Sequence, residues 1–230
     1  MEKEEKKRGA LFVTLATYIF HIFESGIKPH NQELSELCFE IQKAANRRDP
    51  AQLKQAFRIH CQRLLPYYPA PHDEQIDSFL KNVYGEEIFK QVDPHGLGMR
   101  MVAAIKKLFP DKNEEDFEIA EVKDVLGKLF PDHGLKINFE SDRDKRLREI
   151  RSYLFLYKLP WMVRLLNRSE DGSFAKEWIL VEEAKEDISC MDPYPWDDID
   201  EDFVLPVSDF MVRWELAGLE GIWIDQKPIS

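Results

Sequence analysis

The residues best suited to chemistry in this sequence are carboxylates gathered in one short segment, DPYPWDDIDEDF at residues 192–203. Such clusters bind hard cations through oxygen, or dock on basic protein surfaces. Prolines and aromatic residues stiffen the first half of the segment, and the negative charge lies in its second half. We therefore predict a partner-binding site made of Tyr194, Trp196, Asp197, Asp198, Asp200, Glu201 and Asp202.

A metal site is the alternative for the same segment. Asp198, Asp200 and Asp202 have the spacing of the first three ligands of a calcium-binding loop, and Asp209 falls at its last position. Phe203, however, occupies the place where that loop needs glycine. We expect no bound metal, and we keep a metal-dependent enzyme that uses the 197–202 cluster as an alternative function.

A second charged patch is basic and lies in residues 141–160, SDRDKRLREIRSYLFLYKLP. Its apolar residues recur at helical spacing: Leu147, Ile150, Leu154 and Tyr157. The pattern predicts a helix that starts near Ser141 and Asp144 and ends before Pro160. The basic residues of its other face are Arg143, Lys145, Arg146, Arg148 and Arg151. That face is either solvated, with local ion pairs, or a surface for nucleic acid or another partner.

The histidines and cysteines form no familiar metal or catalytic motif. None of the six histidines has the helical pairing of a metal site, and Cys38, Cys61 and Cys190 are widely spaced. We expect buried, reduced thiols, a cytoplasmic location and no cofactor. The sequence also has no phosphate-binding loop, nucleophile elbow or kinase signature, so no motif supports an enzymatic activity.

Charge is distributed unevenly along the chain. The formal net charge is −11, yet residues 143–168 carry 8 basic and 2 acidic side chains, whereas residues 169–230 carry 4 basic and 17 acidic ones. We do not expect a chain this acidic to bind nucleic acid in general, because neutralising phosphates requires a basic surface. The contrast predicts either pairing between the two regions or two patches for different partners.

Helices are predicted to position the basic patch. After a charged leader at residues 1–9, a helix is expected from Ala10 to Glu24, too short to span a membrane. Asn31 is expected to cap a second helix and Asp49-Pro50 to start a third. Three helices with short connections predict an antiparallel bundle.

Further helices are expected after a proline-rich linker at residues 65–74. One begins near His72, with Ile76, Phe79, Leu80 and Val83 facing inward. Another pair follows VDPHGLGMR, residues 92–100, a string that is expected to separate it from the helix before.

Strands are predicted to position the acidic segment. Residues 161–168 and 174–184 flank a loop with Asp-Gly and predict a hairpin. Further strands are expected at 134–140, 203–216 and 221–225, with Pro206 confining the stretch at 203–216 to an edge or splitting it in two. All five tryptophans follow residue 160, and we expect most of them in the core of this sheet.

The predicted fold is α+β. A helical domain at residues 10–157, with a sub-boundary at 65–74, packs against a small, Trp-rich antiparallel sheet in an acidic region at residues 160–230. The predicted function is protein binding without catalysis, as an adaptor, an assembly subunit or an acidic inhibitor of the immunity type. The expected partner is a protein with a basic surface. Nucleic-acid binding through the basic helix at residues 143–151 is the second alternative.

Overall fold

The computed structural model of this chain describes residues 10–45, 50–64, 67, 69–85, 93–137, 142–157, 159–168, 173–191 and 203–228. The chain divides into two compact units. One consists of residues 1–39 together with 95–230, and the other of residues 40–94. Helices form most of the first two-thirds of the chain and a sheet lies at its C-terminal end, so the predicted α+β class is confirmed.

The helices of the described residues are α1 Leu11–Glu24, α2 Gln32–Ala45, α3 Pro50–Leu64, α4 Asp73–Tyr84, α5 Pro94–Lys106, the 3₁₀ helix η2 Glu114–Asp116, α6 Ile119–Leu129, α7 Arg143–Tyr157 and α8 Val207–Ala217. The strands are β1 His133–Lys136, β2 Trp161–Arg168, β3 Phe174–Ala184, β4 Asp187–Met191, β5 Phe203–Pro206 and β6 Gly221–Pro228. Across the described part of the chain, no helix is both long enough and apolar enough to cross a membrane.

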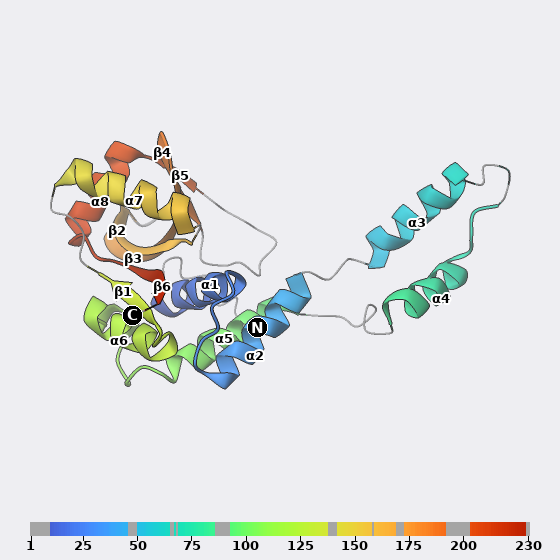
Figure 1. The fold of residues 1–230 in the computed structure, drawn as a ribbon, viewed down its shortest axis with the longest axis horizontal. Helices are drawn as coiled ribbons and strands as arrows, with labels where there is room; N and C mark the ends of the chain where they lie inside the picture. The colour runs from blue at the N-terminus through green and yellow to red at the C-terminus, as the bar shows by residue number, and fades with distance from the viewer. Residues whose placement is uncertain are drawn as a thin grey trace. The chain divides into compact units, whose positions relative to one another are not determined.

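The strands form one six-stranded antiparallel sheet in the order β1-β6-β2-β3-β4-β5 (Figure 1). The predicted hairpin is present: β2 and β3 pair from Trp161 opposite Val181 to Arg168 opposite Phe174. The predicted strand at 221–225 is also present as β6, which lies between β1 and β2. The two edge strands, β1 and β5, are four residues long each, and such short edges limit pairing with other chains.

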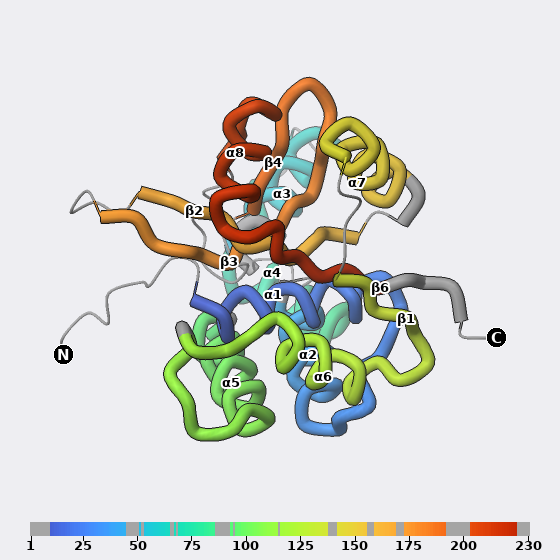
Figure 2. Tube along the Cα trace, turned by 90° about the vertical axis from the view of Figure 1, so that its left-hand side faces the viewer, coloured from blue at the N-terminus to red at the C-terminus, as the bar shows by residue number. Residues whose placement is uncertain are grey.

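Helices cover both faces of the central strands in this unit. Figure 2 shows α7 and α8 on one side of β2 and β3, and α1 on the other. Because both faces are covered, β2 carries buried residues in succession, Trp161, Met162 and Val163, instead of alternating buried and exposed ones. Helix α1 is apolar on nearly all sides and is buried almost along its length, as expected for a core helix.

Most tryptophans belong to the core, as predicted. Trp161 and Trp223 stack with ring centroids 5.0 Å apart, and Trp214 of α8 lies against Trp161 at 6.4 Å. Trp178 is also buried. Trp196 lies outside the described residues. Large aromatic side chains bury much apolar area each, so this cluster stabilises the contact between α7, α8 and the sheet.

Two buried tyrosines complete the hydrogen bonding of β6 at Ile224. The register that pairs Met162 with Ile222 would place Pro160 opposite Ile224, and proline has no N–H to donate. Tyr153 of α7 donates its hydroxyl to the Ile224 carbonyl instead. The Ile224 N–H donates to the hydroxyl of Tyr18 on α1, at 3.0 Å. Helices α7 and α1, which lie on opposite faces of the sheet, therefore both form a hydrogen bond with the backbone of Ile224.

The prediction of a strand over residues 203–216 is wrong beyond Pro206. β5 ends there and α8 follows, because Phe210, Met211, Trp214 and Ala217 have helical spacing and all face the core. Gly218 ends α8 with a φ of 103°, the left-handed conformation that favours glycine. Aromatic and β-branched composition suggested a strand, but the spacing and the end signals are those of a helix.

One predicted interruption is absent, and one helix cap differs from the prediction. Residues 92–100 do not separate two helices: α5 starts at Pro94, and Gly96 and Gly98 lie inside it. Helix α7 is capped by Asp142, whose carboxylate accepts the Lys145 N–H at 2.9 Å. Helix α7 therefore starts at Arg143, between Ser141 and Asp144 as predicted, with Asp142 as its cap.

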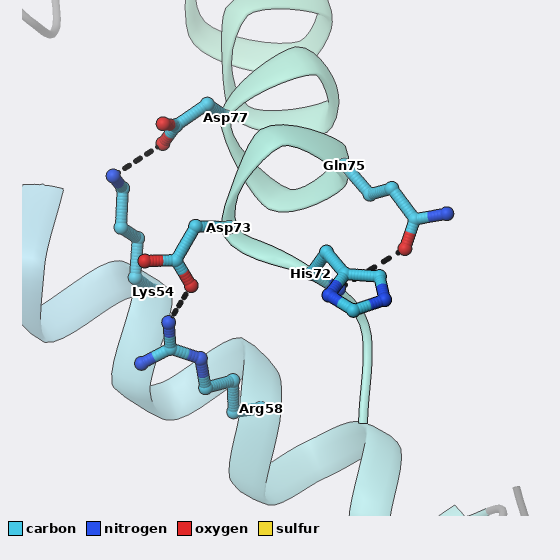
Figure 3. A network of polar contacts seen from close by, with 6 residues as sticks. All are labelled: Lys54, Arg58, His72, Asp73, Gln75 and Asp77. Atoms are coloured by element: carbon cyan, nitrogen blue, oxygen red, sulfur yellow. Dashed lines mark hydrogen bonds and ion pairs between the residues drawn. The ribbon is translucent and has the colours of Figure 1, made fainter. Parts of the chain in front are cut away.

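Helix α3 belongs with α4 to the unit of residues 40–94, whereas α1 and most of α2 belong to the other unit, so the bundle of the first three helices stays a prediction. The antiparallel α3–α4 pair is joined by two ion pairs, Lys54 with Asp77 at 2.5 Å and Arg58 with Asp73 (Figure 3). The predicted start of α4 is confirmed: the Gln75 side chain accepts the His72 N–H at 3.1 Å. Asn31 caps α2 as predicted, with its side chain 3.0 Å from the Leu34 N–H. Ile76 and Leu80 face inward as predicted, whereas Phe79 and Val83 are exposed.

Candidate functional site

A groove lies between α7 and β3 in the unit that holds the sheet. It has a volume of about 880 Å³, and its apolar lining comes from Leu154, Phe155, Pro160 and Ala184. Phe155 is 82% exposed, although it is a large aromatic residue in the middle of a folded unit. An exposed aromatic side chain in a concave apolar surface is typical of a site that binds a partner.

The geometry of α7 explains why Phe155 lies in this groove. The buried face of the helix consists of Arg146, Ile150, Tyr153 and Leu154. Adjacent residues of a helix point about 100° apart, so Phe155 cannot join Leu154 in the core. The Arg151 side chain donates to the Lys185 carbonyl beyond the end of β3 and so ties this part of α7 to the sheet.

Charged side chains of both signs surround the apolar lining. Arg151, Glu182, Glu183 and Lys185 line the groove, and Lys185 pairs with Glu183 at 2.5 Å. An apolar centre with a polar rim is the usual composition of a protein-binding surface. The groove can therefore seat an apolar side chain while its rim selects charged neighbours.

His21 of α1 also lines the groove and is uncharged at neutral pH. Burial lowers the pKa of His21 to about 4. Its Nε2 atom lies 3.2 Å from Met191 Sδ, and its Nδ1 atom lies 3.6 Å from the Glu24 carboxylate. Burial also raises the pKa of Glu24. A neutral imidazole beside a thioether is compatible with a packing role in the wall of the groove.

The predicted partner-binding residues of the acidic segment, Tyr194, Trp196, Asp197, Asp198, Asp200, Glu201 and Asp202, lie outside the described residues. The chain enters this segment from Met191, whose sulfur contacts His21 in the wall of the groove. Met191, the last described residue before the acidic segment, thus contacts a residue that lines the groove.

The second predicted patch does not lie on one exposed surface. Arg143, Lys145, Arg148 and Arg151 are exposed, whereas Arg146 is buried with 3% exposure. The Arg146 guanidinium lies 5.5 Å from the Trp214 ring centroid, and its Nη1 atom is 3.6 Å from the Glu215 carboxylate. Arg146 therefore attaches α7 to α8 and is removed from any exposed binding surface.

The remaining basic residues of α7 are not neutralised by the part of the acidic region that the structure describes. Within the described ranges, no ion pair involves Arg143, Lys145 or Arg148. The Arg146–Glu215 pair does join the basic helix to the acidic C-terminal region. Nucleic-acid binding through the exposed members of this patch stays a prediction.

The described residues contain no group of three or more histidine, cysteine, aspartate or glutamate side chains that could hold a metal ion. The calcium-like spacing of Asp198, Asp200 and Asp202 falls outside those residues, so the metal alternative stays a prediction. The described cysteines are free thiols, with Cys38 and Cys190 buried and Cys61 partly exposed. Burial, with the nearby Glu24 charge adding to it, raises the pKa of Cys38 to about 12, which leaves it an unreactive thiol.

Sequence reasoning missed Phe155, although one signal for it was present. Phe155 follows Leu154 directly and therefore falls outside the apolar stripe of a helix whose other face is charged. An aromatic residue on such a face has no core to enter.

Comparison with known proteins finds no matching family model, curated protein or solved structure for this chain.

Proposed function

We propose that this protein binds another protein without catalysing a reaction, as an adaptor, an assembly subunit or an inhibitor. The observation that carries the proposal is the groove between α7 and β3, with Phe155 82% exposed at its lining. Truncating an aromatic residue at the centre of an interface typically costs about 2 kcal/mol or more of binding free energy. Phe155 is the residue of the groove best suited to that role.

The charge near the groove favours a basic partner. Arg151 and Lys185 balance Glu182 and Glu183 in the lining of the groove, so the net negative charge comes from the acidic segment, with Asp197 and Asp198, into which the chain continues from Met191. Negative charge beside an apolar site speeds association with a positively charged surface and disfavours acidic partners. The partner that fits is a protein segment with an apolar side chain for the groove and lysines or arginines beside it.

The test compares two phenylalanine variants as baits. The wild-type chain, Phe155→Ser and Phe174→Ser are each immobilised, and the proteins retained from the source cells are quantified by mass spectrometry. Phe174 is 69% exposed and lies at the other end of β3, so it matches Phe155 in type and exposure without lining the groove. Any partner is then purified and its dissociation constant is measured with each variant.

The proposal predicts that Phe155→Ser raises the dissociation constant by about 30-fold, while Phe174→Ser keeps it within about twofold of the wild-type value. A partner held equally well by the wild-type chain and by Phe155→Ser would rule out the groove as the binding surface. Retention of no basic partner by the wild-type chain would contradict the proposed function.

A further inference from the structure

A histidine nitrogen and a methionine sulfur meet beside the groove. The Nε2 atom of His21, on α1, lies 3.2 Å from the Sδ atom of Met191, the last residue of β4. The two residues are 170 positions apart in the sequence, so only the fold brings these atoms together. Both residues are half-buried, and His21 lines the groove.

The other ring nitrogen of His21 faces a carboxylate. Its Nδ1 atom lies 3.6 Å from the Glu24 carboxylate. With its proton on Nδ1, the imidazole directs the lone pair of Nε2 toward the Met191 sulfur, which also carries lone pairs. Either a proton on Nε2 or a cation between the two atoms removes their repulsion. A histidine that binds a metal through one nitrogen usually has a carboxylate, carbonyl or water beside the other, as His21 has here.

The two donors suit a soft cation. A thioether sulfur selects copper(I), whereas Mg²⁺ and Ca²⁺ prefer oxygen ligands. A structural zinc site needs four ligands, and the described residues hold no group of three or more histidine, cysteine, aspartate or glutamate side chains that could supply them. Copper(I) is stable with two ligands in a linear arrangement. One imidazole and one thioether are therefore sufficient for it.

The contact has to open to admit the ion. Bonds of about 2.0 Å to nitrogen and about 2.3 Å to sulfur, the lengths found in zinc sites, place the two donors of a linear ion about 4.3 Å apart. The sulfur of Met191 must therefore withdraw by about 1.1 Å from its distance of 3.2 Å. Methionine has three rotatable bonds, and Met191 is only half-buried, so the side chain can make this movement.

We propose that His21 Nε2 and Met191 Sδ bind one copper(I) ion, with the Glu24 carboxylate orienting the imidazole through Nδ1. The site uses neither Phe155 nor the acidic segment, so it goes beyond the proposed partner binding and does not depend on it. The ion enters and leaves as copper(I), without a change of oxidation state.

The test is equilibrium dialysis of the full-length chain under anaerobic conditions, with copper(I) kept in solution by acetonitrile. The wild-type chain is expected to retain one copper(I) ion per chain. Met191→Leu conserves the side-chain volume but removes the sulfur, and His21→Gln removes the imidazole. Each should weaken copper(I) binding by about 100-fold or more, since even the loss of a supporting partner of a metal ligand costs about 10- to 100-fold. Met99→Leu is the matched control, because Met99 is a half-buried methionine of α5, and it should bind like the wild-type chain.

The free cysteines are the competing ligands, because thiolates also bind copper(I). Cys61 is the partly exposed one, and Cys61→Ser is expected to retain copper(I) like the wild-type chain. X-ray absorption of the chain labelled with selenomethionine identifies the ligand directly. Copper should have a selenium neighbour in the wild-type chain and in Met99→Leu, and none in Met191→Leu.

Two controls separate these results from loss of folding and from partner binding. Circular dichroism shows whether each variant is folded, and the selenium signal of the wild-type chain decides the case without any variant. Phe155→Ser is expected to retain copper(I), so the partner site and the copper site fail or hold separately. A wild-type chain that retains no copper(I), a copper spectrum without selenium, or equal retention by folded Met191→Leu or His21→Gln would overturn the proposal.

Discussion

The two tyrosines at Ile224 show how single hydroxyl groups connect elements that are far apart in the sequence. The proline of the LP dipeptide before β2 removes one hydrogen-bond donor, and Tyr153 supplies another for the Ile224 carbonyl. Burial raises the pKa of Tyr18, the other tyrosine, so its hydroxyl stays neutral and available to the Ile224 N–H. These hydroxyl groups thus connect α1 and α7 to the backbone of β6.

Removing the Tyr153 hydroxyl should therefore destabilise the unit. Tyr153→Phe leaves the buried Ile224 carbonyl without this donor and should lower the free energy of unfolding by about 1 to 3 kcal/mol. Tyr84→Phe is the matched control, because Tyr84 is 47% exposed and its hydroxyl can bond to water. Urea unfolding measures the free energy of unfolding of both variants. Equal stability of the two variants would show that the Ile224 hydrogen bond contributes nothing.

His21 should make the stability fall in acid. Its pKa is about 4 in the folded chain and 6.5 unperturbed, so the unfolded chain binds the proton more readily between these values. Stability should therefore decrease as pH falls through this window, by roughly 3 kcal/mol. Met191, Glu24 and the charged lining of the groove surround the ring. The raised pKa of Glu24 acts in the opposite direction.

The His21→Gln variant isolates this contribution. It keeps a neutral polar side chain in the groove wall but cannot take up the proton, so it should lose less stability in acid than the wild-type chain. Thermal unfolding at several pH values between 7 and 4 measures the difference. The same acid dependence in both chains would contradict the assignment to His21.

At the scale of elements, α7 carries two kinds of arginine. Arg146 packs on Trp214 and pairs with Glu215, whereas Arg148 two residues later is exposed. Arg146→Ala removes a buried cation and its packing on the ring, and should cost about 2 kcal/mol or more of unfolding free energy. Arg148→Ala should change it by no more than about 0.5 kcal/mol. Similar losses in urea unfolding would show that Arg146 does not anchor α7.

Local signals predicted most helices and strands, and failed where two signals conflicted. The β2–β3 hairpin follows from alternation around an Asp-Gly loop, and α3 from an Asp-Pro start. The same Asp-Pro signal precedes α5, but the prediction took all of residues 92–100 as an interruption between helices. In α8, β-branched and aromatic residues concealed a helical spacing. Tertiary contacts bury Phe210 and Trp214 and favour a helix there. Amino-acid composition does not reveal such contacts.

The candidate site could be predicted only in part. The charge of the acidic segment and of α7 is visible in the sequence, but the burial of Arg146 depends on α8, which lies far along the chain. The groove is likewise formed by α1, α7 and β3. These elements are far apart in the sequence, so no local pattern predicts that they pack together. Phe155 alone carried a local signal, because it interrupts the polar face of its helix.

At the scale of the whole molecule, charge is distributed unevenly along the chain. The negative charge is concentrated after residue 168, and the groove lies where the chain leaves β4 for the acidic segment. The unit of residues 40–94 has a balanced formal charge. We infer that the acidic side of the molecule, beside the groove, is the one that a basic partner binds.

The most direct test of the proposed function is the salt dependence of partner binding. Partner binding should weaken steeply from low to physiological salt, so the dissociation constant should rise. The reason is that salt screens the attraction between the acidic segment and the basic partner. A variant with Asp197, Asp198, Asp200 and Asp202 changed to Asn and Glu201 changed to Gln should bind more weakly at low salt and show a much shallower dependence. Binding that is insensitive to salt, or equally steep in this variant, would contradict the account.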